Sequence, residues 1–309
     1  MNSEARIFIY FVVPLQLFMA HKSGFVNIVG SPNVGKSTLM NQLVGEKLSI
    51  VTSKAQTTRH RILGIVNDDD YQIVFSDTPG VVNAAYKLHE AMMEYVNASL
   101  KDADVLLFIT DTFESEMNHK ETLDKIKKLK VPVLCLINKI DLSNQEKLTE
   151  RVEYWQEQLP AALIYPISAL HKFNIDQVWN KILELIPESP PYYDKEEISD
   201  RPMRFFISEI IREKIFLHCQ KEIPYSCQVE IEEYKEEETI VRIRALIIVE
   251  RDSQRGIIIG RGGEMLKRIG REARIEMEKF IGQKVYLENY VKVDKDWRST
   301  DAKLKKYGY

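Results

Sequence analysis

A short segment near the start of the chain has the residue types and the spacing of a phosphate-binding loop. From Gly30 to Ser37 it reads G-x-x-x-x-G-K-S. Glycines let backbone N–H groups curl around phosphate oxygens, Lys36 can reach the β- and γ-phosphates, and the Ser37 hydroxyl can ligate Mg²⁺. The apolar stretch before the loop and the apolar-periodic stretch after it predict the strand–loop–helix setting that this chemistry requires. The predicted phosphate contacts are Gly30, Ser31, Pro32, Asn33, Val34, Gly35, Lys36, Ser37 and Thr38.

A second polar segment, Asp77-Thr78-Pro79-Gly80, ends another apolar stretch. An aspartate at the carboxyl end of a strand can hold the Mg²⁺ shell, and the Gly80 N–H can contact the γ-phosphate. Loss of that phosphate would release the following loop, which is an order–disorder switch. Residues 53–60 and 77–90 are therefore named the first and second switch loops. In the first, either Thr57 or Thr58 could close on Mg²⁺, and the spacing does not decide between them.

A third segment, Asn138-Lys139-Ile140-Asp141, can read a guanine base. The Asp141 carboxylate can accept two hydrogen bonds, from N1–H and from the 2-amino group of guanine. Adenine lacks this donor pair and would leave a desolvated carboxylate unpaired. Asn138 would brace the loop, and the stem of Lys139 would cover the base. Backbone N–H groups of Ser168, Ala169 and Leu170 would meet the guanine O6. The motifs together predict a site for GTP or GDP with Mg²⁺.

The elements that must position these motifs alternate between strand and helix. This alternation predicts a mostly parallel sheet with helices on both faces and ligands at the carboxyl ends of the strands. The predicted strands are 25–30, 62–67, 71–76, 105–110, 131–137 and 163–167, and the predicted helices are 38–44, 86–99, 117–129, 145–157 and 174–186.

The second half of the chain has a different composition. Three prolines within 187–191 and the charges after them predict a linker. Apolar spacing then predicts a helix over 202–220, strands near 225–234 and 239–250, a basic helix after the glycine-rich segment 256–263, and a last strand over 285–293.

The net charge of the whole chain is only −3, which argues against a generic polyanion binder. However, residues 187–254 hold 10 Lys/Arg and 16 Asp/Glu, whereas 255–309 hold 14 and 8, which favours a local anionic partner.

The motif set resembles the Era family of translation-factor-class GTPases, in which a GTPase domain precedes a KH domain. Besides the nucleotide motifs, the resemblance rests on Ile259-Gly260-Arg261-Gly262-Gly263, which looks like the Gly-x-x-Gly loop of a KH domain. It implies an α/β P-loop NTPase domain followed by a smaller α+β KH-like domain of type II. The expected boundaries are an extension at 1–19, the GTPase domain at 20–188, a linker at 189–203, the KH-like domain at 204–296 and a tail at 297–309.

The resemblance also implies functions for particular residues. It favours Thr58 as the Mg²⁺ ligand beside Ser37 and Asp77. Val81 and Val82 stand where other GTPases have a glutamine that orients water, and in relatives with this substitution a P-loop asparagine, here Asn33, helps to hold K⁺. We therefore expect K⁺ as an additional cofactor and a slow intrinsic turnover, on the order of 10⁻⁴–10⁻² s⁻¹. The expected catalytic residues are Lys36, Asn33, Thr58 and Gly80.

The KH-like loop predicts RNA as the anionic partner. Its glycines would let the loop approach an RNA backbone and clamp about four nucleotides. Basic side chains on the loop and on the following helix would neutralise phosphates. The resemblance implies 16S-type rRNA near its 3′ end, during assembly of the small (30S) ribosomal subunit, and a monomer in the cytoplasm. The predicted RNA contacts are Gly260, Arg261, Gly262, Gly263, Lys267, Arg268 and Arg271.

The start of the chain leaves alternatives open. The apolar run 7–20 is too short to span a bilayer and poorly matches a secretory signal, since only Glu4 and Arg6 carry charge before it. We expect a non-essential extension, with Met19 as a natural start. One alternative is a membrane-associated GTPase switch that uses this segment at the periphery of the inner membrane. The other is an RNA chaperone with a mainly structural nucleotide site.

Overall fold

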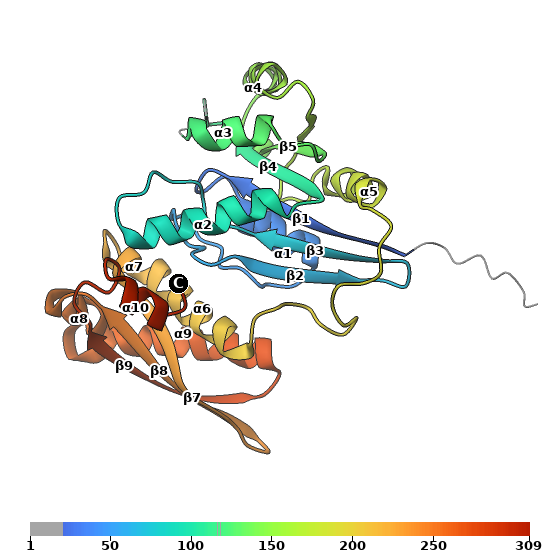
Figure 1. Ribbon diagram of the computed structural model, residues 1–309. Helices are drawn as coiled ribbons and strands as arrows, with labels where there is room; N and C mark the ends of the chain where they lie inside the picture. Colours follow the sequence, from blue (N-terminus) through green and yellow to red (C-terminus); the bar gives the residue numbers. More distant parts are fainter. Residues whose placement is uncertain (1–20, 116, 118) are drawn as a thin grey trace, which may run out of the picture.

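The computed structural model describes residues 21–115, 117 and 119–309, which form two domains packed against each other (Figure 1). The expected extension at 1–19 and its proposed membrane contact lie outside the described residues. Within the described part of the chain, no helix is both long enough and apolar enough to cross a membrane.

The first domain is built on one six-stranded sheet with the order β2-β3-β1-β4-β5-β6. Only β2 runs antiparallel to its neighbour, and the remaining pairs are parallel, which confirms the predicted mostly parallel sheet. The strands are β1 (Lys22–Gly30), β2 (Ile62–Asn67), β3 (Tyr71–Asp77), β4 (Val105–Asp111), β5 (Val133–Asn138) and β6 (Leu163–Pro166).

Helices cover both faces of this sheet, as predicted. Alternate residues of β4 point to opposite sides: Leu107 packs in the cluster with α1 (Lys36–Val44) and α5 (Ile175–Leu185), and Leu106 packs in the cluster on the other face. That second face is covered by α2 (Lys87–Lys101), α3 (Lys120–Lys127) and α4 (Gln145–Gln158). A 3₁₀ turn, η1 (Ile140–Leu142), follows β5. Because both faces are buried, the parallel strands are almost continuously apolar.

The linker follows the edge of the first sheet. The Ile65 N–H donates to the Ile198 carbonyl at 2.9 Å, so the linker takes up a hydrogen-bonding group that edge strand β2 would otherwise leave unpaired. The Gln72 Oε1 accepts bonds from the backbone N–H groups of Tyr192 and Tyr193 at 2.7 and 3.0 Å. These contacts hold the linker against the first domain.

The second domain packs helices against a three-stranded sheet with the order β7-β8-β9. β7 is antiparallel to β8, and β9 is parallel to it. The order of helix and strands around the glycine loop is the predicted KH-like order. The elements are α6 (Met203–His218), α7 (Ile223–Ser226), β7 (Gln228–Glu236), β8 (Ile240–Val249), α8 (Asp252–Ile259), η2 (Arg261–Gly263), α9 (Glu264–Ile281) and β9 (Lys284–Val293).

Helix α8 is an element that the sequence analysis did not assign. The Gln254 Oε1 accepts bonds from the backbone N–H groups of Glu250 and Arg251 at 2.9 and 3.1 Å, which caps the start of the helix. Ile258 is buried, whereas Ile257 is half exposed, so the isoleucine-rich run is one face of a short helix.

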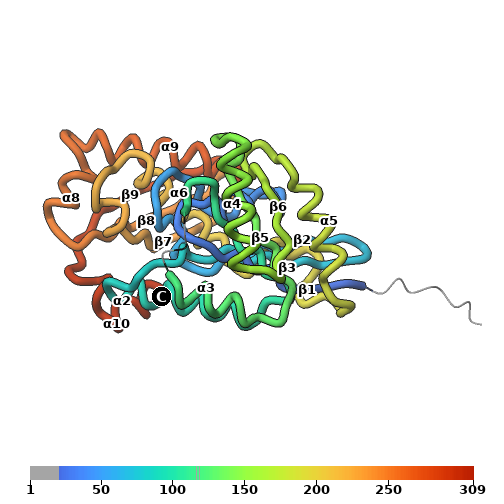
Figure 2. The backbone as a smooth tube through the Cα atoms, turned by 90° about the horizontal axis from the view of Figure 1, so that it is seen from above, coloured from blue at the N-terminus to red at the C-terminus, as the bar shows by residue number. Residues whose placement is uncertain are grey.

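The C-terminal tail, expected at 297–309, is packed against the rest of the molecule. Trp297 is fully buried and its Nε1 donates to the Ser226 carbonyl at 3.0 Å. Helix α10 (Asp301–Lys306) then lies beside α2 in both views (Figures 1 and 2), where Leu304 packs near Leu88. The apolar side chains at 297, 304 and 307 bury the tail against both domains.

Candidate functional site

The predicted nucleotide motifs meet around one cavity of about 370 Å³ at the carboxyl ends of the strands. The loop after β1 and the first switch loop form its walls, with Gly80 and Lys139 at its edges. A larger cavity, of about 460 Å³, lies between residues 47–50 and helices α6 and α9. Its lining combines six apolar and seven charged side chains and contains none of the motif residues, whereas the smaller cavity contains residues of the phosphate loop.

The glycine-rich loop has the curled backbone that phosphate binding requires. Gly35 has φ 102°, and a Cβ there would lie 2.2 Å from the Asn138 Nδ2, so only glycine fits. Lys36 is 6% exposed, and its Nζ donates to the carbonyls of Gly30 at 3.1 Å and Ser31 at 2.7 Å. Burial lowers the pKa of Lys36 to about 8, against the opposing effects of Asp77 and Glu114. A bound phosphate would give this ammonium group an anionic hydrogen-bond partner.

The three side chains expected to ligate Mg²⁺ are in mutual contact. Asp77 Oδ2 accepts from the Ser37 hydroxyl at 2.7 Å and from the Thr58 hydroxyl at 3.1 Å, and the two hydroxyls are 2.9 Å apart. Asp77 is fully buried, its Oδ1 has no hydrogen-bond partner among the described residues, and burial raises its pKa. A buried carboxylate with a free oxygen beside two hydroxyls is a donor set that suits a hard divalent cation.

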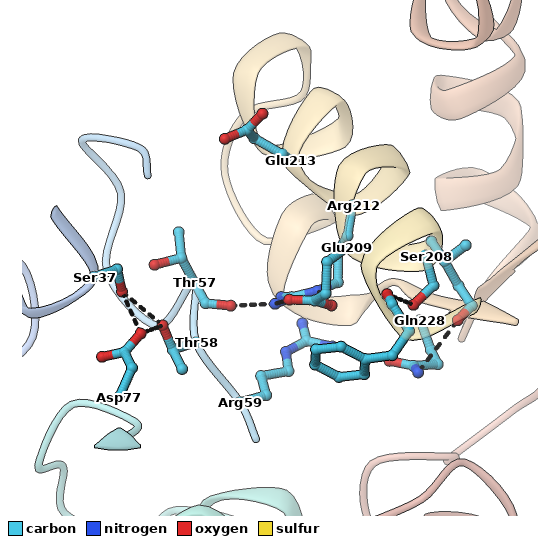
Figure 3. A network of polar contacts seen from close by, with 12 residues as sticks. Ser37, Thr57, Thr58, Arg59, Asp77, Ser208, Glu209, Arg212, Glu213 and Gln228 are labelled. Atoms are coloured by element: carbon cyan, nitrogen blue, oxygen red, sulfur yellow. Dashed lines mark hydrogen bonds and ion pairs between the residues drawn. The ribbon is translucent and has the colours of Figure 1, made fainter. Parts of the chain in front are cut away.

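The geometry separates the two threonines that the sequence leaves open. The Thr58 hydroxyl belongs to the Asp77 cluster, whereas the Thr57 carbonyl accepts a hydrogen bond from Arg212 of the second domain (Figure 3). Adjacent residues of the first switch loop therefore face a candidate metal site and the second domain, respectively.

The second switch loop starts tightly packed against the phosphate loop. The Thr78 hydroxyl donates to the Ile28 carbonyl at 2.7 Å, and the Val81 N–H donates to the Gly30 carbonyl at 3.1 Å. At Gly80 a Cβ would lie 2.8 Å from the Pro32 Cα. This close approach explains why glycine is needed after Pro79, and it leaves the Gly80 backbone at the wall of the cavity.

The predicted base-reading residues also come together. Asn138 donates to the Val34 carbonyl at 2.8 Å and accepts from the Ala169 N–H at 2.9 Å, so it joins the phosphate loop to the segment after β6. The Asp141 Oδ1 accepts from the Ser168 hydroxyl at 2.6 Å. Leu170 is 69% exposed. Asp141 lies in the chain between Lys139 and Leu142, which both line the cavity.

Four residues of the site were missed by the sequence analysis. Asp111 accepts from Lys139 Nζ at 2.6 Å and from the N–H groups of Phe113 and Glu114, so it shapes the loop after β4. Glu114 in turn accepts a hydrogen bond from the Ser31 hydroxyl and one from Thr110 at 2.7 Å. Exposed Phe113 and Leu142 line the cavity beside Lys139. Asp111 could have been found from the sequence, since it ends strand β4 as Asp77 ends strand β3.

The first switch loop is bonded directly to the second domain. Arg59 is 2% exposed, and its guanidinium donates to the carbonyls of Cys227 at 2.7 Å and of Pro224 and Tyr225 at 3.0 Å each. Lys54 donates to the carbonyls of Phe216 and Cys219 at the end of α6. Figure 3 shows the side chains of Thr58 and Arg59 extending from one stretch of the loop toward opposite sides.

The second switch loop contacts the second domain through its helical end. The Leu88 N–H donates to the Arg298 carbonyl at 3.1 Å, and Leu88 packs in a cluster with Trp297 and Tyr307. His89 is 3.2 Å from the Gln56 Oε1, which connects the two switch loops. Both segments predicted to respond to the γ-phosphate therefore form the domain interface.

The predicted RNA-binding loop is exposed at the far side of the second domain. Gly262 and Gly263 have φ 61° and 80° and no neighbouring atom within 4 Å of an added Cβ, so the backbone is open to close approach. Arg261, Lys267, Arg268 and Arg271 are all exposed. Of these four, only Arg268 has an ion-pair partner among the described residues, Glu272 at 3.3 Å.

Comparison with known proteins supports a GTPase domain in the first half of the chain and a KH domain in the second half. The profile described as "50S ribosome-binding GTPase" matches residues 25–139, and the KH domain profile matches 222–298. The chain is 44% identical to GTPase Era of Staphylococcus haemolyticus over 291 residues, 94% of this chain and 97% of that protein. The Staphylococcus epidermidis protein of the same name is 43% identical over the same shares.

Two solved structures are similar over almost the whole chain. One is Era in complex with MgGDPNP and nucleotides 1506–1542 of 16S ribosomal RNA, with a TM-score of 0.89 and 40% identity, covering 94% of this chain and 99% of that one. The other is a variant of Aquifex aeolicus Era bound to GDP·AlF4⁻, also with a TM-score of 0.89 and 40% identity, covering 93% and 99%.

Proposed function

Because this chain belongs to the Era family of GTPases, we propose that it uses its GTP cycle to control how its KH domain binds small-subunit rRNA near the 3′ end. The observation that carries this proposal is the first switch loop. There Thr58 lies in the candidate metal cluster, while the next residue, Arg59, donates three hydrogen bonds to carbonyls of the KH domain. A change at the γ-phosphate that moves Thr58 therefore also moves the next residue, Arg59, which is bonded to the KH domain.

We assign the phosphate chemistry to the loop after β1 and the residues around it. Lys36 pairs with the β- and γ-phosphates, and backbone N–H groups of residues 30–38 and of Gly80 surround their oxygens. Ser37, Thr58 and Asp77 hold Mg²⁺, because their oxygens already converge and the Asp77 Oδ1 is free. When bound, Mg²⁺ neutralises charge on the β- and γ-phosphate oxygens.

Guanine specificity rests on Asp141, with its Oδ1 fixed by the Ser168 hydroxyl at 2.6 Å. The carboxylate accepts from the N1–H and the 2-amino group, and Asn138 keeps this loop tied to the phosphate loop. The Lys139 stem, held by Asp111, covers one face of the base with Phe113 and Leu142 nearby.

Hydrolysis in this site proceeds without a water-orienting glutamine side chain at residues 81 and 82. Val81 is 5% exposed, so that position is occupied by a buried apolar group. Asn33 has φ 64° and donates to the Ser53 carbonyl at 3.2 Å, which places its amide between the phosphate loop and the first switch loop. This location supports Asn33 as the residue that helps to hold K⁺, and a rate that does not respond to K⁺ would remove that assignment.

The RNA target follows from the family and from the relative that contains 16S ribosomal RNA nucleotides 1506–1542. The description "50S ribosome-binding" belongs to a profile that covers only residues 25–139 and leaves the KH domain out. We expect the protein to act as a monomer in the cytoplasm. No relative reported above favours the membrane-associated switch or the chaperone with a structural nucleotide site.

A binding measurement in two nucleotide states tests this proposal. The RNA probe is a fragment equivalent to the 3′ end of 16S rRNA, and the protein is loaded with Mg²⁺ and either a non-hydrolysable GTP analogue or GDP. We expect tighter RNA binding with the GTP analogue, and a difference that is reduced in Arg59→Gln although guanine nucleotide binding remains. Equal RNA affinity in both states of the unmodified protein would refute the coupling.

A further inference from the structure

A separate cavity of about 300 Å³ lies at the junction of the two domains. It is formed where the first switch loop, the beginning of α6, strand β7 and the C-terminal residues meet. Its lining contains the cations Arg201, Arg204 and Lys306, together with His60 and Phe205. None of the residues assigned above to nucleotide or RNA lines it, so it is a distinct feature of the molecule.

Cations outnumber carboxylates around this cavity. Arg59 directly precedes the lining residue His60, and Arg212 bonds to the lining residue Glu209. Both arginines are buried, to 2% and 1% exposure, and Figure 3 shows them next to one another. Both oxygens of Glu209, which lines the cavity, are taken by Arg212 at 2.7 Å. Glu230 is the other carboxylate in the lining.

The cations of the cavity have few anionic partners. In the described part of the chain, the one carboxylate within ion-pair distance of Arg201 is that of Asp200, with 3.8 Å between the charged atoms. Among the described residues, neither Arg204 nor Lys306 has a carboxylate within ion-pair distance. The hydrogen bonds that Arg59 makes to other described residues all go to backbone carbonyls. The junction therefore carries more positive than negative side-chain charge among the residues that the structure describes.

Several buried nitrogen atoms at this junction lack hydrogen-bond partners among the described residues. The Nε of Arg201, the Nη1 of Arg212 and the Nδ1 of His60 have no hydrogen-bond partner among the described residues. Burial lowers the pKa of His60 to about 3, and the charges of Arg201, Arg212 and Arg59 act in the same direction, so its ring is neutral. The two guanidinium N–H groups are unsatisfied buried donors, which are costly, and an anion that accepts from the Arg201 Nε, which belongs to a lining residue, would lower that cost.

We propose that this cavity binds a phosphate-type anion, supplied either by a free phosphorylated small molecule or by the backbone of bound RNA. Guanidinium groups match the geometry of phosphate oxygens, and a lysine adds a mobile point charge. Because His60 forms part of the wall and directly follows Arg59, an anion here strengthens the attachment of the first switch loop to the KH domain.

The test uses the full chain saturated with GDP and Mg²⁺, so that the nucleotide site is filled. Inorganic phosphate is titrated while the imidazole signals of His60 are followed by NMR in protein with labelled histidine. We expect a saturable shift, and in Arg204→Glu/Lys306→Glu an apparent affinity that is lower by roughly tenfold or more. The matched control is Lys127→Glu/Lys128→Glu at the C-terminal end of α3, which makes the same charge change at exposed positions of the other domain.

RNA binding of the same variants distinguishes the two sources of phosphate. If phosphate gives no saturable shift but the cavity variant binds RNA more weakly, with a smaller salt dependence than the control variant, the anion is an RNA phosphate. If the cavity variant loses GDP binding, Arg204→Gln and Lys306→Gln are compared singly. No response of His60 to phosphate, together with equal RNA affinity in cavity and control variants, overturns the proposal.

Discussion

At the scale of single residues, the nucleotide site contains groups whose burial is unfavourable until a ligand arrives. Lys36 and Asp77 are both buried, and burial shifts their pKa values toward the neutral forms, down for the amine and up for the carboxyl group. Such a site is prepared for charge that the chain does not carry. This is a physical reason for stability to depend on the nucleotide.

Lys36 predicts a measurable pH dependence of stability in the nucleotide-free protein. Its pKa is about 8 in the folded state against 10.5 as a free group, so the unfolded chain binds more protons between these values. The free energy of unfolding should therefore rise with pH through this window, by about 3 kcal/mol at most. Below pH 8 the full cost of the buried charge remains.

Urea unfolding of the protein and of Lys36→Met at pH 7, 8.5 and 10 measures this effect. The variant should lack the rise, so the difference between the two proteins should change with pH. A constant difference across the three pH values would show that Lys36 is not the titrating group.

Asp141→Asn should change the choice of base. The amide can donate where the carboxylate only accepts, so guanine loses a match and xanthine gains one. We expect GTP affinity to fall by roughly a hundredfold or more and xanthosine triphosphate to become the preferred nucleotide. Calorimetry with both nucleotides measures the change, with Asp124→Asn on exposed α3 as the control. An unchanged preference would contradict the assignment of Asp141.

At the scale of elements, each group of functional residues follows the end of a strand or the start of a helix. Asp77, Asp111 and Asn138 are the last residues of β3, β4 and β5, and parallel pairing brings those ends to one edge of the sheet. The KH loop likewise lies between α8 and α9. Loops supported on both sides in this way can expose backbone without losing their position.

The KH loop predicts a separation of RNA binding from nucleotide binding. Arg261→Asp should weaken RNA binding and reduce the slope of affinity against salt by about one, because one phosphate contact is lost. GTP affinity should stay the same. Arg242→Asp is a matched control, since Arg242 lies on β8 between residues that point to the core and is itself exposed. Loss of both activities in Arg261→Asp would instead indicate misfolding.

At the scale of the whole molecule, the domains are joined by the switch loops and by the C-terminal tail. Trp297 is buried between them, α10 lies against α2, and the Tyr309 ring stacks on His60 with 4.3 Å between ring centres. The KH domain and the C-terminal tail therefore both contact the switch loops. We expect a change in the conformation of either loop to alter this interface.

Trp297→Ala tests how much the tail contributes to that closure. Removing a fully buried indole should lower the free energy of unfolding by about 3–5 kcal/mol, and the lost packing lies at the domain interface. We expect a larger radius of gyration in small-angle scattering and a nucleotide affinity close to that of the unmodified protein. A compact variant with weakened GTP binding would show that Trp297 supports the nucleotide site instead.

The local sequence was enough to predict the nucleotide chemistry. Backbone curvature, helix starts and strand ends are encoded within a few residues, so the phosphate loop, the Asp77 segment and the Asn138–Asp141 segment could be found from spacing alone. The KH-like order of elements was predicted for the same reason. Helix α8 was missed because its start depends on a cap by Gln254 within a segment whose glycine and isoleucines give no clear helical period.

The tertiary structure decided what each switch residue contacts beyond the nucleotide. The hydrogen bond from the Thr58 hydroxyl to Asp77 distinguished Thr58 from Thr57 as the candidate metal ligand. Arg59 donates to the carbonyl of Cys227, a residue 168 positions away in the chain. The burial of Trp297 and the cationic junction around His60 likewise need residues from both domains. Sequence specifies short-range geometry because neighbours in the chain share a few torsion angles, whereas contacts between distant segments exist only once the domains have packed.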